Sequence, residues 1–223
     1  MMKPSTAGWL FAAWVALSGM SSAQVVHFDS GAAGTLPSGW TSATTHQGGT
    51  PRWEVTRDDT APTKPNVLAQ LSSDGARDQF PLAVYDEVTC KDGEVGVRFK
   101  PISGKVDQAG GLVWRYLDEN NYYVVRANAL EDNVVLYKLE KGRRSSLAPK
   151  GTPPKTYGMD WKVPGQTWST LRVTFEGALF TVYFNGEKLF EVEDSTFTEA
   201  GKTGLWIKAD SVTHFDDFHV TPK

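Results

Sequence analysis

Two arginines interrupt an otherwise apolar stretch at residues 110–139, and their spacing is the clearest indication of chemistry in the sequence. Residues 118–121 (Asp-Glu-Asn-Asn) are turn formers between two runs of β-branched and aromatic residues, which predicts a hairpin. Because side chains alternate between the faces of a strand, one face of this hairpin carries Arg115, Tyr122, Arg126 and Asn128. The opposite face has no charge and is the predicted core, with Leu112, Trp114, Tyr116, Tyr123, Val125 and Ala127.

The arginine face has the composition of a ligand-binding surface. Arginine offers a planar fork of donors that suits carboxylates or paired hydroxyls, and tyrosine and asparagine add a flat ring and an amide. Sugar-binding grooves combine aromatic platforms with such hydrogen-bonding groups. We expect Trp161, Lys208 and His214 at the edge of this surface. The alternative is that each arginine pairs with a carboxylate on a neighbouring strand and has a structural role.

Paired carboxylates that could hydrolyse a glycoside are harder to find. A retaining glycosidase needs two carboxyl groups about 5 Å apart. Glu191 and Glu193 share a face of one strand, but the residues between and beside them are apolar, so we expect both glutamates to face solvent. Asp216 and Asp217 are neighbours on a strand and are expected to point to opposite faces. Hydrolysis at the arginine face would require Asp216, Asp217 or Glu131 within about 6 Å of the arginines.

Three aspartates near the chain ends could hold a structural calcium ion. Asp29 lies on the predicted opening strand and Asp216 and Asp217 on the closing strand. Calcium binds several hard oxygen ligands, and carbonyl groups of a Gly/Ser-rich loop could supply the rest. The alternative is a set of solvated or salt-bridged carboxylates. No other cofactor is expected.

Other function classes lack their residue patterns. The four histidines have no metal-ligand spacing, and Cys90 is the single cysteine, so it forms no internal disulfide and is expected to be a small buried residue. There is no Gly-x-Ser-x-Gly elbow, phosphate-binding loop or dinucleotide fingerprint. The net charge of −3, with no basic patch, argues against a nucleic-acid partner.

The elements that position these residues are short strands. Alternating segments separated by turns recur along the chain, with no helical period, which predicts an all-β antiparallel sandwich of the jelly-roll type. Asn185-Gly186 is the strongest hairpin signal, because both residues accept positive φ. The first and last strands are expected to pair. We expect long loops at residues 30–51 and 143–164.

The first 23 residues have the pattern of a secretory signal peptide. Lys3 precedes an apolar run, and Ser21-Ser22-Ala23 offers the small residues of a cleavage site. Residues 24–223 are then one domain of an exported protein, periplasmic or secreted. No stretch of the mature chain is apolar over the length that a membrane span requires.

Three segments carry a family resemblance. Residues 110–116 with 121–126, residues 168–174 with 182–186, and residues 204–218 (GLWIKADSVTHFDDF) resemble the strands of concanavalin A-like, or laminin G-like, jelly-roll domains. Their order is similar to that of bacterial domains of the 3-keto-disaccharide hydrolase type, a family described as family-16 glycoside hydrolase-like. The resemblance extends from Phe28 to Val220 and implies a fold more specifically than an activity, because lectins and glucanases share it.

The expected function is recognition of a glycan or glycoconjugate on the concave sheet around Arg115 and Arg126. A glycoside hydrolase, as the resemblance implies, is one alternative, although the Glu-Asp-Glu pattern of family-16 glucanases is absent. A structural module of the cell envelope is another; its arginines would be capped by carboxylates. The sugar and the oligomeric state do not follow from the sequence.

Overall fold

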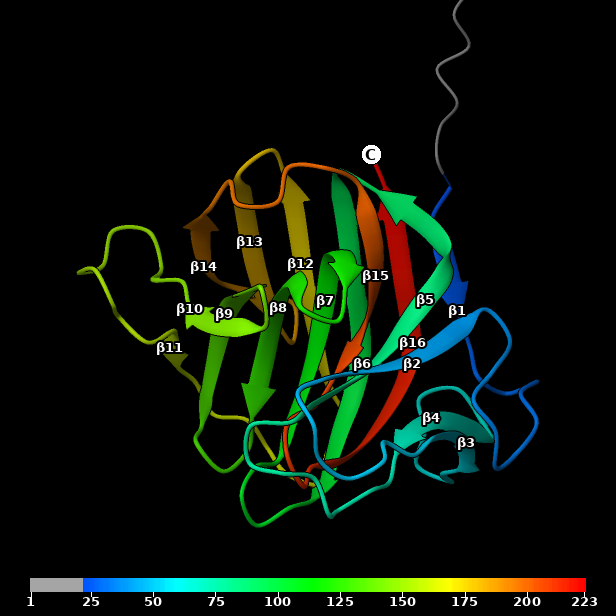
Figure 1. Ribbon diagram of the computed structural model, residues 1–223. Coiled ribbons are helices and arrows are strands. Elements are labelled where there is room, and N and C mark those ends of the chain that lie inside the picture. Colours follow the sequence, from blue (N-terminus) through cyan, green and yellow to red (C-terminus); the bar gives the residue numbers. More distant parts are fainter. Residues whose placement is uncertain (1–21) are drawn as a thin grey trace, which may run out of the picture.

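Alternation of apolar and polar residues builds two antiparallel sheets in the computed structural model, which describes residues 22–223 (Figure 1). The predicted signal peptide lies outside the described residues except for its last two. The described part contains no helix, and so none that could cross a membrane. The protein is therefore the all-β antiparallel sandwich that the sequence predicts.

Sheet 1 has the strand order β14-β13-β12-β6-β16-β4-β3, with β1 paired to β16. Its strands are β1 (Gln24–Val26), β3 (Trp53–Arg57), β4 (Asn66–Gln70), β6 (Gly93–Ser103), β12 (Ser169–Glu176), β13 (Leu179–Phe184), β14 (Glu187–Glu193) and β16 (Val212–Pro222). Sheet 2 has the order β10-β9-β8-β7-β15-β5-β2, with β11 paired to β9. Its strands are β2 (Trp40–Thr45), β5 (Phe80–Cys90), β7 (Ala109–Asp118), β8 (Asn121–Asn128), β9 (Asn133–Glu140), β10 (Arg143–Ser146), β11 (Met159–Asp160) and β15 (Gly201–Trp206).

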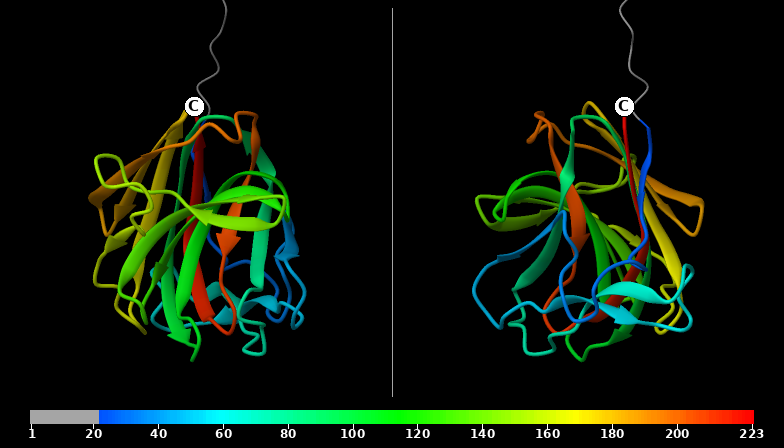
Figure 2. Two further views of the ribbon diagram at one scale, coloured as in Figure 1. Left: turned by 60° about the vertical axis from the view of Figure 1, so that its left-hand side comes forward. Right: turned by 90° about the vertical axis from the view of Figure 1, so that its right-hand side faces the viewer.

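The sequence predicted one hairpin turn and the pairing of the terminal strands correctly, and it missed three strands. Asn185 and Gly186 join β13 to β14 with φ values of 49° and 83°, the left-handed conformations that a tight hairpin needs. The first and last strands pair, with Gln24 opposite Val220, and Figure 2 shows β1 beside the end of β16. Strand β2 was missed because it lies inside the Gly- and Ser-rich tract taken as a loop. Strands β10 and β11 likewise occupy the second predicted loop.

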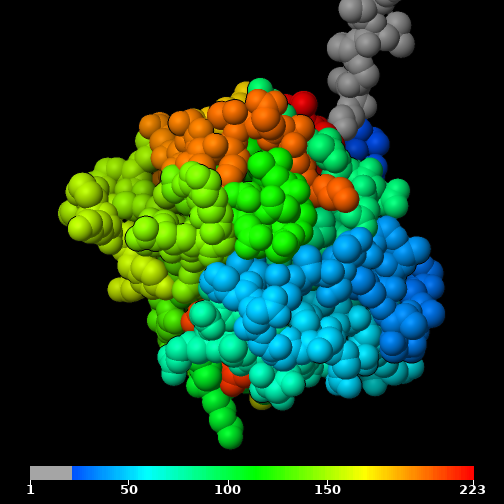
Figure 3. Space-filling model, viewed as in Figure 1, coloured from blue at the N-terminus to red at the C-terminus, as the bar shows by residue number. Residues whose placement is uncertain are grey.

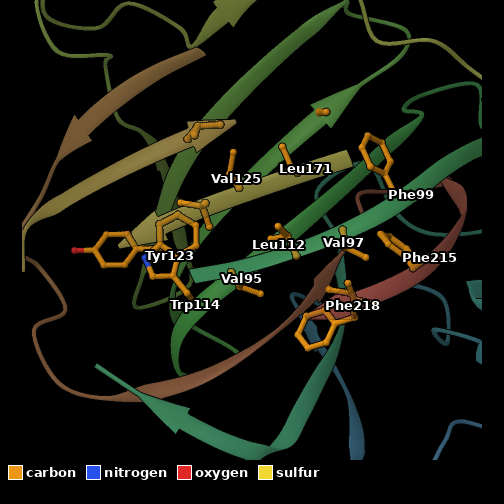
Figure 4. Close-up of a cluster of buried hydrophobic side chains, with 14 of the residues drawn as sticks. Val95, Val97, Phe99, Leu112, Trp114, Tyr123, Val125, Leu171, Phe215 and Phe218 are labelled. Atoms are coloured by element: carbon orange, nitrogen blue, oxygen red, sulfur yellow. The ribbon is translucent and has the colours of Figure 1, made fainter. Parts of the chain in front are cut away.

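Apolar side chains from both sheets fill the space between them. The predicted core residues of the central hairpin lie here, including Leu112, Trp114, Tyr123 and Val125, and all are fully buried. Figure 4 shows them facing side chains of β6, β12 and β16. Cys90 is buried in the same cluster, as expected, and burial raises the pKa of its thiol to about 11. Trp40 and Trp53, which begin β2 and β3, also pack in this core.

Sheet 2 curls so strongly that its two edges meet across its outer face. The Thr45 hydroxyl of edge strand β2 lies 2.7 Å from the Tyr122 hydroxyl of β8, and the His46 ring bonds the Gly142 carbonyl of the β9–β10 turn at 2.9 Å. The outer face is therefore concave. It holds a second apolar cluster, here called the outer core: Phe80, Leu82, Val84, Ala109, Val113, Tyr122, Val124, Val135, Tyr137, Leu139 and Trp206.

The alternation of β7 breaks at Arg115, and this corrects the prediction that Arg115 and Arg126 share a face. Arg115 has φ 46°, and the register with β8 shifts between Trp114 and Asp118. This bulge turns the Arg115 side chain into the space between the sheets, where its guanidinium lies 5.5 Å from the Phe180 ring. Tyr116, predicted to be core, moves to the outer face and packs on Tyr122.

Candidate functional site

Arg115 is a structural residue that ties loops of both sheets together at one end of the sandwich. Its side chain is fully buried and makes four hydrogen bonds. It donates to the carbonyls of Lys91 at 2.9 Å, Phe197 at 2.7 Å and Gly177 at 2.7 Å, and to the Asp92 carboxylate at 3.2 Å. Because four of its five N–H donors bond protein acceptors and the side chain is fully buried, Arg115 is not accessible to a ligand.

Arg126 remains on the predicted face and organises a polar cluster at the rim of the outer core. Its guanidinium, 1% exposed, donates to the Glu131 carboxylate at 2.7 Å, the Tyr157 hydroxyl at 3.0 Å and the side-chain amide oxygen of Asn133 at 2.9 Å. Its centre lies 5.8 Å from the Tyr137 ring, and the Tyr137 and Tyr157 hydroxyls bond each other. These five residues are called the Arg126 cluster below.

The Arg126 cluster presents two groups to solvent. Glu131, in the β8–β9 turn, is 38% exposed, and Tyr157 is 47% exposed. Burial raises the pKa of Glu131, but the hydrogen bond and charge of Arg126 outweigh it and hold that pKa below its ordinary value. Glu131 is therefore an ionised acceptor. Among residues 22–223 its Oε2 accepts both hydrogen bonds, from Arg126 and Asn133, and its Oε1 accepts none.

The turn that follows Tyr157 fixes its position. Gly158 has φ 60°, and a Cβ there would collide with the Val134 carbonyl of β9. The missing side chain lets the long β10–β11 connection approach β9 closely, so the Tyr157 hydroxyl is held within hydrogen-bonding distance of Arg126 Nη2. The rigid placement of an exposed aromatic ring is what a stacking platform for a sugar requires.

Asn128 and Lys208, two more predicted site residues, meet at the same end of the outer face. Asn128 donates to Asp107 at 2.6 Å, and the Lys208 ammonium contacts the other oxygen of Asp107 at 2.5 Å. Asn128 and Asp107 are fully buried, whereas Lys208 is partly exposed. The first two thus position Lys208, which is the member of the group that faces solvent.

Three predicted site residues do not join this arrangement. Tyr122 is fully buried, and its hydroxyl is bonded to Thr45 where the edges of sheet 2 meet. Trp161 packs against the core between the sheets. His214 lies on β16 of sheet 1, because the chain crosses from one sheet to the other after Lys208; its Nδ1 bonds Asp58 at 2.8 Å. His214 is therefore not on the outer face of sheet 2 with Lys208, although the two residues are close in the sequence.

Asp58 joins His214 and Lys100 in a buried ion group on sheet 1. The carboxylate contacts the Lys100 ammonium and accepts two hydrogen bonds from Thr60. Burial lowers the pKa of His214, and the charge of Lys100 acts in the same direction against the hydrogen bond to Asp58. A neutral His214 that donates from Nδ1 fits this arrangement, which fastens the β3–β4 loop to the sheet.

Asp216 and Asp217 lie on the same side of the sheet, contrary to the alternation argument. Asp217 has φ 49° and sits in a bulge of β16, so both carboxylates come within 4.8 Å of the His27 ring. Asp29 instead accepts a hydrogen bond from the Asn66 backbone. The group does not suit calcium: Asp216 is bonded by Thr63, and Asp217 contacts His27 at 2.8 Å and Arg98 at 3.0 Å. The guanidinium already supplies the positive charge.

The glutamates of β14 face solvent, as expected. Glu191 pairs with Lys188 at 2.6 Å, and Glu193 pairs with Lys150. They are not a catalytic pair. Of the carboxylates that hydrolysis at the arginine face would require, Glu131 contacts Arg126. Because Glu131 is held ionised, it can accept a proton or a hydrogen bond but does not suit the role of general acid.

No protein-family model matches the chain, and no curated protein matches it in sequence. Solved structures do. Cip1, a cellulose-induced protein, has a TM-score of 0.60 at 13% identity, over 90% of this chain and 97% of that one. The carbohydrate-binding module CBM66 from Bacillus subtilis has a TM-score of 0.57 at 21% identity, over 81% and 93%. Domain 4 of the arabinanase AbnA from Geobacillus stearothermophilus, solved with arabinotriose, has 0.53 at 15%, over 90% and 93%.

The chain shares its fold with these domains. At such identities the likeness establishes the jelly-roll β-sandwich and leaves the residues of any binding site to be argued from the structure itself. The predicted membership of the 3-keto-disaccharide hydrolase family stays a prediction, because none of these three structures is described in those terms.

Sequence reasoning missed Tyr157 and Asp107 and considered Glu131 solely as a possible acid or base. Tyr157 lies in a Pro-, Lys- and Gly-rich connection with no strand alternation to orient it. Its one local signal is the following glycine. Asp107 lies before β7 and meets Lys208, 101 residues away in the chain, through the tertiary fold.

Proposed function

We propose that this chain is an exported carbohydrate-binding domain that recognises a glycan at the Arg126 cluster, on the concave side of sheet 2. The observation that carries the proposal is the pairing of an exposed aromatic ring, Tyr157, with an ionised carboxylate, Glu131, that has one free oxygen. Both are held by one buried guanidinium. A sugar ring stacked on Tyr157 can donate a hydroxyl to Glu131.

The arrangement is preorganised, which favours affinity. Arg126 holds both residues, and Asn133 and Tyr137 hold them from the other side, so binding orders few side chains. Lys208 adds a partly exposed donor on the same outer face. Two proteins of similar fold give the proposal indirect support: one is named as a carbohydrate-binding module, and the other was solved with a bound arabinotriose.

Glycan-array screening of the wild-type protein followed by calorimetry on the best ligand tests the proposal. Tyr157→Ala should weaken binding about tenfold or more, and Glu131→Gln by a similar factor, because each removes one arm of the site. Glu140→Gln, an exposed carboxylate on the neighbouring strand β9, is the matched control and should bind normally. An array with no retained glycan, or equal affinity of Tyr157→Ala and wild type, would reject the proposal.

A glycoside hydrolase is the second candidate, favoured by the contact of Glu131 with Arg126. Its weakness is the lack of a partner acid in the Arg126 cluster. Assays of the wild-type protein and Glu131→Gln on 3-keto-glycosides and ordinary glycosides decide between the two. Turnover that disappears in Glu131→Gln would establish catalysis. Binding without turnover would leave a recognition domain.

The envelope-module alternative also has an observation in its favour, since both arginines are paired with carboxylates. It differs from the binding proposal in one measurable respect. A purely structural Arg126 cluster predicts that Tyr157→Ala and Glu131→Gln change stability alone, with no glycan affinity to lose. Export follows from the signal-peptide pattern and is tested by fractionating cells that express the full chain.

A further inference from the structure

Arg144 is a partly buried guanidinium on the outer face of sheet 2, and it has no acidic partner among residues 22–223. It lies on β10, directly opposite Leu139 of β9, and cross-strand partners project to the same side of a sheet. Since Leu139 belongs to the outer core, Arg144 projects over the concave face. The φ values of 54° and 77° at Lys141 and Gly142 form the tight turn that brings β10 back along β9.

Two aromatic rings hold the Arg144 guanidinium. Its centre lies 4.7 Å from the Phe80 ring of β5 and 4.6 Å from the Tyr137 ring of β9, so it bridges opposite sides of the curled sheet. Tyr137 also packs against Arg126, at 5.8 Å, and bonds Tyr157. Arg144 therefore adjoins the Arg126 cluster through a shared ring, on the side away from Glu131.

The polar atoms of Arg144 are poorly satisfied. Its Nη1 is buried and has no hydrogen-bond partner in the part of the chain that the structure describes. Of the four arginines in residues 22–223 that are not exposed, Arg115, Arg126 and Arg172 each pair with a carboxylate, and Arg144 does not. Stacking on aromatic rings offsets part of the cost of taking the cation out of water, but it supplies no hydrogen-bond acceptor.

Figure 3 shows the blue N-terminal segments and the yellow-green segment around residues 141–158 on the face of the molecule that is turned toward the viewer. Arg144 itself is partly exposed. Because Nη1 is buried, a ligand stacked on Tyr157 would meet Arg144, beyond Tyr137, at its Nε and Nη2 donors, which form a planar fork that pairs with no carboxylate of residues 22–223. Such forks bind the two oxygens of a carboxylate or sulfate in parallel.

We propose that the glycan bound at this site is acidic, and that Arg144 binds the oxyanion of one of its sugar residues. The class of ligand is a polysaccharide that contains uronic acid or sulfated sugar residues. This inference rests on the proposed function, because it assigns the charge of the ligand at the same surface. It adds Arg144, which lies outside the Arg126 cluster, as a residue that determines specificity for charged sugars.

Matched pairs of glycans test it, each pair with one backbone in acidic and neutral form. Suitable pairs are oligogalacturonate with its carboxyl-reduced form, glucuronoxylan with unsubstituted xylan, and sulfated with desulfated galactan. We expect the wild-type protein to bind the acidic member of its preferred pair about tenfold to a hundredfold more tightly. The difference should shrink at high salt, because screening weakens an exposed ionic contact. The uronate and sulfate arms identify which oxyanion is recognised.

Three variants separate the role of Arg144 from a general charge effect. Arg144→Gln should abolish the preference for the acidic glycan, and Arg144→Lys, which keeps the charge without the fork, should retain part of it. Arg143→Gln is the control, since Arg143 is the adjacent exposed arginine with the opposite orientation on β10. Thermal melting confirms that each variant is folded.

The outcomes distinguish the two proposals. Equal binding of neutral and acidic glycans, or an unchanged preference in Arg144→Gln, would overturn the role of Arg144 and leave glycan recognition in place. Retention of no glycan by the wild-type protein would reject the proposed function, and the inference with it. Loss of the preference in Arg144→Gln but not in Arg143→Gln supports both.

Discussion

Replacing Arg115 by alanine should destabilise the protein strongly, although the sequence alone makes Arg115 a candidate ligand-binding residue. The guanidinium is 0% exposed and bonds three carbonyls and one carboxylate from the β5–β6 turn, the β12–β13 turn and the β14–β15 connection. These segments belong to both sheets. Without the side chain, these loops of the two sheets lose the hydrogen bonds that connect them through Arg115.

The magnitude follows from the contacts. A hydrogen bond from a charged donor contributes about 1.5–3 kcal/mol, but the Lys91 and Gly177 carbonyls belong to exposed residues and can bind water after the substitution. The Phe197 carbonyl belongs to a buried residue and loses its donor. The total loss should therefore be close to that for breaking a buried ion pair, which lowers the free energy of unfolding by about 3–5 kcal/mol. For a chain of this size the melting temperature should fall by roughly 6–20 °C.

Calorimetry or circular dichroism melts of three variants measure this effect. Arg115→Ala should show the full loss, and Arg115→Lys an intermediate one, because a single ammonium cannot reach all four acceptors. Arg143→Ala, an exposed arginine, should stay within about 0.5 kcal/mol of wild type. A melting temperature of Arg115→Ala equal to that of wild type would show that the buried guanidinium does not hold these loops together, and would return Arg115 to the candidate ligand residues.

Three further predictions concern groups away from the Arg126 cluster. The pKa of His214 is lowered in the folded protein, so neutral His214 stabilises the fold above the unfolded pKa near 6.5, and this contribution is lost as pH falls through the folded pKa. Urea titrations between pH 7.5 and 5 should therefore show a shallower decline in the free energy of unfolding for His214→Gln than for wild type. Parallel profiles of the two proteins would contradict the assignment. Chelation with EDTA should leave the melting temperature unchanged, because Arg98 already pairs with Asp217 and Thr63 donates to Asp216. A drop in melting temperature that calcium reverses would restore the metal site. Cys90, buried and with its pKa raised to about 11, should react with a thiol reagent at pH 8 in denaturant but not in the native protein, and rapid native labelling would refute its burial.

What the sequence determined is the part of the structure that rests on local periodicity and turn chemistry. Alternation assigned Leu112, Trp114, Tyr123 and Val125 to the core between the sheets, and Asn185-Gly186 specified the β13–β14 hairpin. It also placed Arg126 and Asn128 on the outer face, where they lie. These features depend on neighbouring residues in one strand or one turn, so a pattern of a few residues contains the information.

Tertiary structure decided the site itself. The bulge that turns Arg115 inward lies against Gly201 of β15, where a Cβ would come within 2.5 Å of the Arg115 backbone carbonyl carbon, so a glycine is needed at that position. Hydrogen-bond acceptors from three connections far away in the chain then stabilise the inward side chain. The curl of sheet 2 brings Phe80 to Arg144 and Thr45 to Tyr122. Neither arrangement leaves a periodic signal, because each depends on contacts between residues far apart in the chain. The sequence therefore determined the sandwich, and the packing of distant segments determined which of its polar residues are buried and which face solvent.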